Sequence, residues 1–176
     1  MIKVKELTRA TTLAAMRAIN RAIESGRVQG IRALRQYYNV KAKDVRAATS
    51  IYPKARFSDL RAVLNIKGNP LPVSIFSPRE RLKRGTKYKE ITVKIKKGGI
   101  RRLIPGAFLA QMRYTKTAPG VFIRQSAERS DVKHLYTLSL PQMWDNEAQQ
   151  ATEARAREQL EKELKAQMRY YIERVK

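Results

Sequence analysis

Apolar residues recur at helical spacing through the first quarter of the chain. A helix is predicted over residues 8–25, because its apolar side chains fall on one face: Leu13, Met16, Ile19 and Ile23. Gly26 is expected to end this helix. A second helix is predicted over residues 28–39, and a short third helix over residues 41–49. The N-terminal region is therefore expected to be helical.

Alternation of apolar and polar residues then replaces the helical spacing. Strands are predicted at residues 59–67, 73–76, 91–96, 100–104, 121–124 and 135–140. The apolar run at 107–112 fits either a continued strand or one helical turn. This order predicts an α+β fold, in which N-terminal helices precede an antiparallel sheet of about five or six strands.

The last part of the chain predicts one long amphipathic helix that begins near residue 142 or 145. No Gly or Pro interrupts residues 142–176, and the apolar positions form one narrow stripe: Leu160, Leu164, Met168, Tyr171 and Val175. The stripe has two interpretations, a subunit interface or a cover for the sheet. The expected organisation is a single domain with a basic α+β body at 1–141 and an appended helix at 142–176.

Charge separates these two parts. The chain has 38 Lys and Arg against 15 Asp and Glu, a net charge of +23. Residues 142–176 contain seven Lys or Arg and seven Asp or Glu, so the whole surplus lies upstream of them. Such a body attracts polyanions, whereas the neutral helix is suited to a protein partner.

Two sequence features exclude other classes of protein. The absence of cysteine excludes disulfides, thiolate nucleophiles and thiolate metal sites. No apolar run approaches the roughly 20 residues that cross a bilayer, so no membrane partner is expected.

Cations concentrate in and after residues 77–90. Six of them lie within that segment, which is expected to be an exposed arm joining two strands: Arg79, Arg81, Lys83, Arg84, Lys87 and Lys89. Four more flank the next turn: Lys96, Lys97, Arg101 and Arg102. These ten residues are the candidate phosphate contacts, and the alternative is a solvated surface that keeps the protein soluble.

The turn Gly98-Gly99 has two interpretations. Between two strand runs, a Gly-Gly pair predicts a type I′ hairpin. A phosphate-binding loop would instead need a helix directly after the glycines. Because another strand is predicted there, no nucleotide site is expected.

No arrangement typical of an enzyme is found. His134 is the only histidine, and the carboxylates before residue 142 are scattered without metal-binding spacing. No catalytic residue, metal or cofactor is therefore expected. A nucleic-acid-binding alternative comes from residues 27–50, which resemble a helix-turn-helix whose second helix would carry Lys41, Lys43 and Arg46 into a major groove.

The order of features resembles the minor tail protein Z family of lambda-like phages and prophages, over most of the chain. The most specific element is the motif Ile104, Pro105, Gly106, Ala107 and Phe108. Further matching segments are Ala18-Ile19-Asn20-Arg21-Ala22, Ala47-Ala48-Thr49, Asn69-Pro70-Leu71-Pro72-Val73, Gly120-Val121-Phe122-Ile123-Arg124 and Leu140-Pro141-Gln142-Met143, with Val40 and Val45.

This resemblance implies a structural virion protein that completes the head-proximal end of a long tail, so that a head can attach and the DNA end is positioned. The implied partners are other tail proteins, the head–tail connector and DNA bound without sequence preference. A homo-oligomeric ring in the virion is implied, with isolated copies able to be monomeric, and with assembly in the host cytoplasm. The family supplies no catalytic residue or cofactor, and its motif residues are expected to determine the fold.

Overall fold

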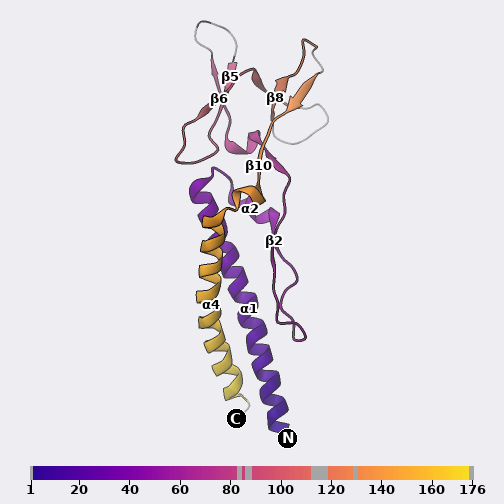
Figure 1. Cartoon of the computed structure of the whole chain (residues 1–176), viewed down its shortest axis with the longest axis vertical. Helices are drawn as coiled ribbons and strands as arrows, with labels where there is room; N and C mark the ends of the chain where they lie inside the picture. Colours follow the sequence, from indigo (N-terminus) through magenta and orange to yellow (C-terminus); the bar gives the residue numbers. More distant parts are fainter. Residues whose placement is uncertain (1, 83–84, 86–88, 112–118, 129–130, 175–176) are drawn as a thin grey trace. The chain divides into compact units, whose positions relative to one another are not determined.

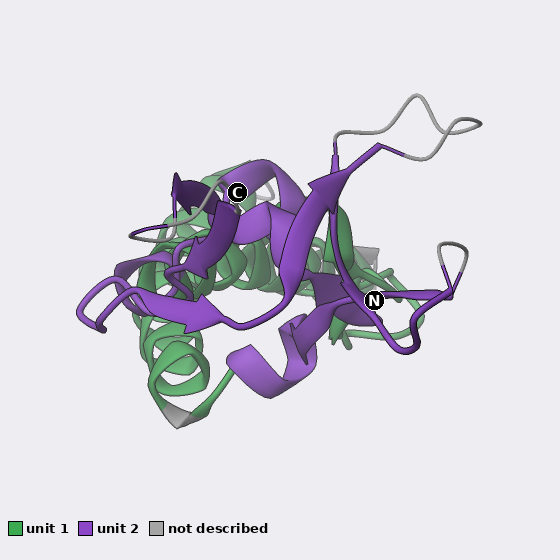
Figure 2. Ribbon diagram, turned by 90° about the horizontal axis from the view of Figure 1, so that it is seen from above, with its two compact units in different colours: residues 1–34, 46–67, 144–176 green, residues 35–45, 68–143 purple. Residues whose placement is uncertain are grey.

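The computed structural model describes residues 2–82, 85, 89–111, 119–128 and 131–174, and its fold is α+β, as the sequence predicts. The chain forms two compact units (Figure 2). Unit 1 contains Met1–Leu34, Arg46–Lys67 and Trp144–Lys176, whereas unit 2 contains Arg35–Val45 and Gly68–Met143. The expected division at residue 141 into body and appended helix stays a prediction.

Unit 1 is built around two long antiparallel helices. Helix α1 (Ile2–Tyr37) contributes its residues up to 34, and α4 (Asn146–Glu173) runs antiparallel beside it. The N-terminal end of α1 and the C-terminal end of α4 therefore lie at the same end of the pair (Figure 1). Asp145 caps α4 by accepting a hydrogen bond from the backbone N–H of Ala148. The predicted C-terminal helix is therefore confirmed.

The expectation that Gly26 ends the first helix is wrong. Helix α1 continues through Gly26 and Gly30, because these glycines let α4 approach closely. A Cβ added at Gly30 would lie 2.1 Å from Thr152 Oγ1 and 2.4 Å from Trp144 Cζ2, and one at Gly26 would lie 2.8 Å from the Thr152 carbonyl oxygen. The four-residue spacing continues a row of buried alanines earlier in α1: Ala10, Ala14, Ala18 and Ala22.

A short strand pair completes unit 1. Strand β1 (Thr49–Ile51) pairs antiparallel with β2 (Leu64–Ile66), so the predicted strand over 59–67 forms only near its end. The chain before β2 is instead fixed by a turn, in which the Arg56 and Asp59 backbones exchange hydrogen bonds of 2.8 and 3.2 Å. The predicted short helix is present as α2 (Ala42–Ala48), but it stops before Thr49.

Unit 2 contains small antiparallel sheets rather than one sheet of five or six strands. One three-stranded sheet consists of β4 (Arg79–Leu82), β5 (Lys89–Val93) and β6 (Arg102–Ile104), and another of β7 (Ala107–Ala110), β8 (Gly120–Arg124) and β9 (Val132–His134).

A third sheet of unit 2 pairs β3 (Pro70–Pro72) with β10 (Tyr136–Ser139). Proline has no N–H to donate, which limits how far β3 can be extended into a ladder. Short helix α3 (Leu140–Met143) follows β10. The largest fully buried side chains of this unit are Val45, Phe76, Ile91, Val121, Leu140 and Met143.

The strand predicted at residues 73–76 is wrong, since the segment forms the 3₁₀ helix η1 (Val73–Phe76). Its first and last residues, Val73 and Phe76, are both buried, which fits a repeat of three residues per turn. Ser77 ends the helix in the left-handed conformation, with φ of 50°. The predicted exposed arm over 77–90 includes β4 and the start of β5, which pair antiparallel.

The hairpin between β5 and β6 is confirmed, with Thr92 opposite Leu103, but its type I′ turn is wrong. Neither Gly98 nor Gly99 has a positive φ. The connection instead hydrogen-bonds to the end of α1 and the residues after it. Lys97 N–H donates to the Tyr37 carbonyl at 2.7 Å, and Asn39 N–H donates to the Ile95 carbonyl at 2.8 Å. These bonds hold the connection open as a longer loop.

Candidate functional site

The candidate phosphate contacts gather on sheet β4-β5-β6 and its connecting loop. Lys83, Arg84 and Lys87 lie outside the described residues. The exposed members of the set are Arg79, Arg81, Lys89, Lys96, Lys97 and Arg102. Unit 2 as a whole has nineteen Lys and Arg against five Asp and Glu, a surplus of 14 positive charges. The larger share of the net charge therefore lies in this unit.

Strand register explains why two arginines share one face. Ile91 and Val93 of β5 are buried, so the residues that alternate with them, Glu90 and Thr92, face away from the core. Arg79 lies opposite Thr92 and Arg81 opposite Glu90, which places both arginines on this outer face.

Two of the candidate phosphate contacts already form hydrogen bonds or an ion pair within the sheet. Arg101 donates to the carbonyl oxygens of Ser77 at 3.1 Å and Thr92 at 3.0 Å, so it holds β5 to the end of η1. Lys89 Nζ lies 2.6 Å from a carboxylate oxygen of Glu80. Within the described chain, no hydrogen bond or ion pair engages the cationic groups of the other exposed members. These are the residues available to an anionic partner.

The apolar stripe of α4 lies against α1 within unit 1. Leu160 borders a hollow of about 210 Å³ together with Ile19 and Ile23, and the guanidinium of Arg17 lies 5.2 Å from the ring centre of Tyr171. Met168 is half-buried, whereas Val175 lies outside the described residues. Leu164 is 38% exposed and is the most exposed of the stripe residues that the structure describes.

A charged contact joins the same two helices. The Arg21 guanidinium donates to Glu163 at 2.7 Å, and Gln159 donates to the other carboxylate oxygen at 3.0 Å. The hydrogen bond from Arg21 lowers the pKa of Glu163 below its ordinary value, and this effect exceeds the opposing effect of burial. The pair therefore helps to align α1 with α4.

The motif at 104–108 forms the corner between two sheets. Ile104 ends β6, and Gly106 has a φ of 68°, a left-handed conformation that favours glycine. Ala107 is buried at the start of β7, and the Phe108 ring lies 6.2 Å from that of Phe122. The motif residues thus occupy positions that set the path of the chain.

Sequence reasoning missed an aromatic cluster on sheet β7-β8-β9 and beside it. The His134 ring stacks on Phe122 at 4.7 Å, and its Nδ1 lies 3.0 Å from the Tyr136 hydroxyl. Gly120 leaves room for this stack, because a Cβ there would lie 2.8 Å from Phe122 and 2.9 Å from His134 Nε2. These contacts assign His134 a packing role. The clue in the sequence was the spacing of aromatic rings on alternate residues.

No group of three or more His, Cys, Asp or Glu side chains that could hold a metal ion occurs in the part of the chain that the structure describes. Over the same ranges, no helix is both long enough and apolar enough to cross a membrane.

Comparison with protein families gives one match that covers most of the chain. The family described as prophage minor tail protein Z (GPZ) matches residues 2–174. The chain belongs to this family. No curated protein and no solved structure matches it. As a member of the minor tail protein Z family, it is a structural component of a phage tail and hence of the virion.

Proposed function

We propose that this chain completes the head-proximal end of the tail, where it promotes head joining and positions the DNA end. The observation that carries the proposal is the family match over residues 2–174. The proposed partners are other tail proteins, the head–tail connector and DNA. The proposed assembly is a homo-oligomeric ring that forms in the host cytoplasm.

The charge distribution supports a contact with DNA in unit 2. Cations that neutralise phosphates release counterions, which gives affinity that depends on salt and not on sequence. Arg79, Arg81 and Arg102 project from short strands, and Lys96 and Lys97 from the loop that joins two of them. Repetition of this set around a ring would surround a DNA end with positive charge.

A particle-assembly experiment tests the proposal. A phage that lacks this gene is expected to accumulate DNA-filled heads and tails of normal length that remain separate in electron micrographs. Addition of the purified chain to such an extract should restore joined particles. Joined and infectious particles in the absence of the chain would contradict the proposal.

A charge-reversal experiment tests the DNA contact separately. The double variant Arg79→Glu/Arg81→Glu is expected to lower affinity for double-stranded DNA by roughly tenfold or more at low salt, because two phosphate contacts are lost. The slope of log affinity against log salt concentration should also become shallower by about 0.9 for each lost contact. The matched control is Lys162→Glu/Lys165→Glu, which reverses two exposed cations on α4.

Both charge-reversal variants are titrated with random-sequence DNA and with candidate operator DNA at several salt concentrations. Equal losses in the two variants would show that the effect is only one of net charge. Tight binding to one sequence at physiological salt would favour the helix-turn-helix alternative and contradict a sequence-independent contact.

A further inference from the structure

We propose that a groove at the N-terminal end of α1 is a docking site for an acidic amphipathic helix of another virion protein. The groove lies within unit 1 and has a volume of about 640 Å³. It is lined by Val4, Lys5, Thr8, Arg9, Leu13 and Phe57. Because the DNA contact is assigned to unit 2, this inference does not depend on it.

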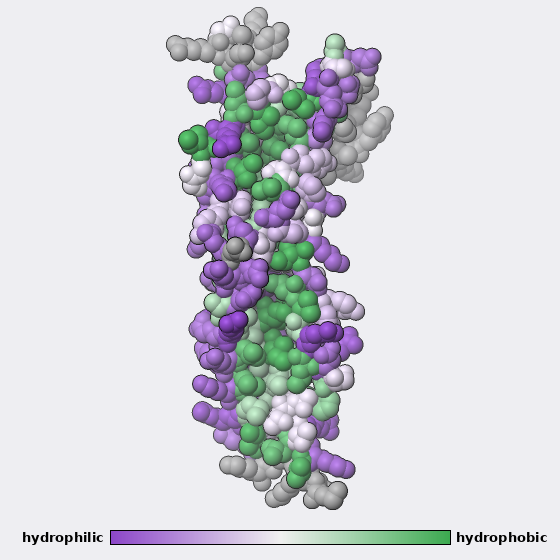
Figure 3. Space-filling view, viewed as in Figure 1, coloured by the Kyte–Doolittle hydropathy of each residue, from purple (hydrophilic) through white to green (hydrophobic). Residues whose placement is uncertain are grey.

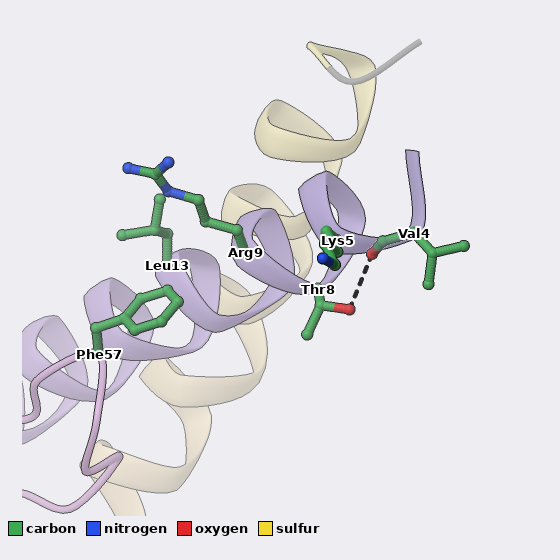
Figure 4. A pocket seen from close by; sticks show the side chains of 6 residues that line it. All are labelled: Val4, Lys5, Thr8, Arg9, Leu13 and Phe57. Atoms are coloured by element: carbon green, nitrogen blue, oxygen red, sulfur yellow. Dashed lines mark hydrogen bonds between the residues drawn. The ribbon is translucent and has the colours of Figure 1, made fainter. Parts of the chain in front are cut away.

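Three of the residues that line the groove are apolar: Val4, Leu13 and Phe57. Figure 4 shows the Phe57 ring beside Leu13, with Val4 further toward the N-terminus of α1. Val4 is 68% exposed and Phe57 is 51% exposed. The Thr8 hydroxyl donates to the Val4 carbonyl at 2.9 Å, so it is already satisfied within its own helix. Large exposed side chains arranged in this way are typical of a binding surface.

The exposed apolar surface extends beyond the groove itself. Leu7 is exposed on the same turn of α1, and the segment that carries Phe57 also exposes Tyr52, Leu60 and Val63. Hydrophobic side chains form a band over the N-terminal half of α1 in the space-filling view (Figure 3). A partner that covered this band would remove it from water.

The groove is held in shape before any partner binds. Asn20 on α1 exchanges two hydrogen bonds of 2.9 Å with the backbone of Ala55, which is buried and lies two residues before Phe57. The Tyr52 N–H donates to the Val63 carbonyl at 2.9 Å and closes the base of the segment. A preformed site loses little freedom on binding, which favours affinity.

Charge identifies the occupant. Lys5 and Arg9 line the groove, and the exposed residues Lys54 and Arg56 come shortly before Phe57 in the chain. The nearby carboxylates are fewer, since α1 contributes Glu6 and the segment contributes Asp59. A cationic rim around an apolar floor is complementary to a helix with acidic residues beside an apolar face. A second copy fits less well, because neither of its long helices is acidic: α1 carries a surplus of positive charge and residues 142–176 are neutral.

The test measures binding of labelled 18-residue peptides to the full chain by fluorescence anisotropy. The probe is an amphipathic helix with Leu and Phe on one face and Glu on the other. The first control peptide has the same composition in scrambled order, and the second has Lys in place of Glu. The acidic amphipathic peptide is expected to bind at least tenfold more tightly than either control, and addition of salt should weaken its binding.

Variants locate the bound peptide. Val4→Ser/Phe57→Ser should weaken binding of the acidic peptide by roughly tenfold or more, since burial of two large side chains is lost. Lys5→Glu/Arg9→Glu should reverse the preference in favour of the Lys peptide. The matched control is Tyr170→Ser, an exposed aromatic on α4 that does not line the groove. All these side chains are exposed, so each variant is expected to keep the melting temperature of the parent chain.

Three results would overturn the proposal. The first is equal affinity for the acidic and scrambled peptides, and the second is binding that the groove variants do not alter. The third is concentration-dependent dimerisation in sedimentation experiments that the Val4→Ser/Phe57→Ser variant abolishes, because it would show that a second copy occupies the groove.

Discussion

The two units of this chain differ in how their cores are packed. Unit 1 relies on two long helices brought together by residues with little or no side chain, among them Gly26 and Gly30. Unit 2 relies on short strands and on large buried side chains such as Phe76. The first unit is therefore sensitive to added volume and the second to lost volume. The units also differ in charge, because the larger surplus of positive charge lies in unit 2.

The largest effect is expected from lost volume in unit 2. Phe76→Ala should lower the free energy of unfolding by about 3–5 kcal/mol, because it removes a fully buried aromatic ring. Hydrogen exchange by mass spectrometry should show faster exchange in β5 and β8 than in α1 and α4. The control Leu82→Ala, at a 65% exposed position, should change little. An equal loss of protection from hydrogen exchange in both units would show that they unfold together, and it would contradict the proposed difference between the two cores.

The converse prediction concerns added volume in unit 1. Gly30→Ala should lower the free energy of unfolding by about 1–3 kcal/mol, because its Cβ would overlap Thr152 and Trp144 despite the better helix propensity of alanine. The fluorescence of Trp144, the only tryptophan, reports on unfolding in urea. Gly98→Ala is the control, since nothing lies within 4 Å of a Cβ at that position. A Gly30→Ala chain as stable as the parent would mean that α4 can shift without loss.

A smaller effect on stability, but a large one on assembly, is expected at Leu164. Leu164→Asp should lower the free energy of unfolding by no more than about 1 kcal/mol, because the side chain is 38% exposed. If α4 also forms a subunit interface, the variant should not be incorporated into tails, as measured by immunoblotting of purified particles. Normal incorporation would assign the stripe to packing against α1 alone.

The smallest effect is expected from the ion pair of unit 1. A lowered pKa means that Glu163 stabilises the fold above its unfolded-state pKa, near 4.3, and that this contribution is lost as pH falls through the folded-state pKa. Because Arg21 is 59% exposed, solvent screening limits the contribution to about 0.5 kcal/mol. Glu163→Gln should therefore be slightly less stable than the parent at pH 7 and equal to it at low pH.

Urea titrations at several pH values measure this difference. Arg21→Gln should produce the same pH dependence, since it removes the other partner of the pair. A difference between parent and Glu163→Gln that grows as pH falls would contradict the assignment.

Local patterns predicted the elements that depend on local chemistry. The long helix α4 and the pairing of β5 with β6 both follow from the spacing of apolar residues within one segment or two adjacent ones. Features that depend on distant partners were not predictable in this way. Sequence alone indicates a helix end at Gly26, because the packing of α4 against this glycine depends on residues far along the chain. The segment Val73–Phe76 is typical of a strand in sequence, but it forms a 3₁₀ helix in which its first and last residues are both buried.

In the candidate site, too, local features were predictable and features that depend on distant residues were not. Composition predicted a cationic body, but it did not show that Arg101 donates hydrogen bonds to the carbonyl oxygens of Ser77 and Thr92. The groove beside Phe57 was also missed, because residue 57 is far in sequence from Val4 and Leu13. Periodicity within one segment carries no information about a surface that two segments build together.

The separation of α1 from α4 along the chain has a consequence for folding. Contact between these two helices closes a loop that contains most of the other residues, whereas most strands of unit 2 pair with a neighbour in sequence. Because closing a long loop costs entropy and slows contact formation, the two-helix pair is expected to form more slowly than the hairpins of unit 2.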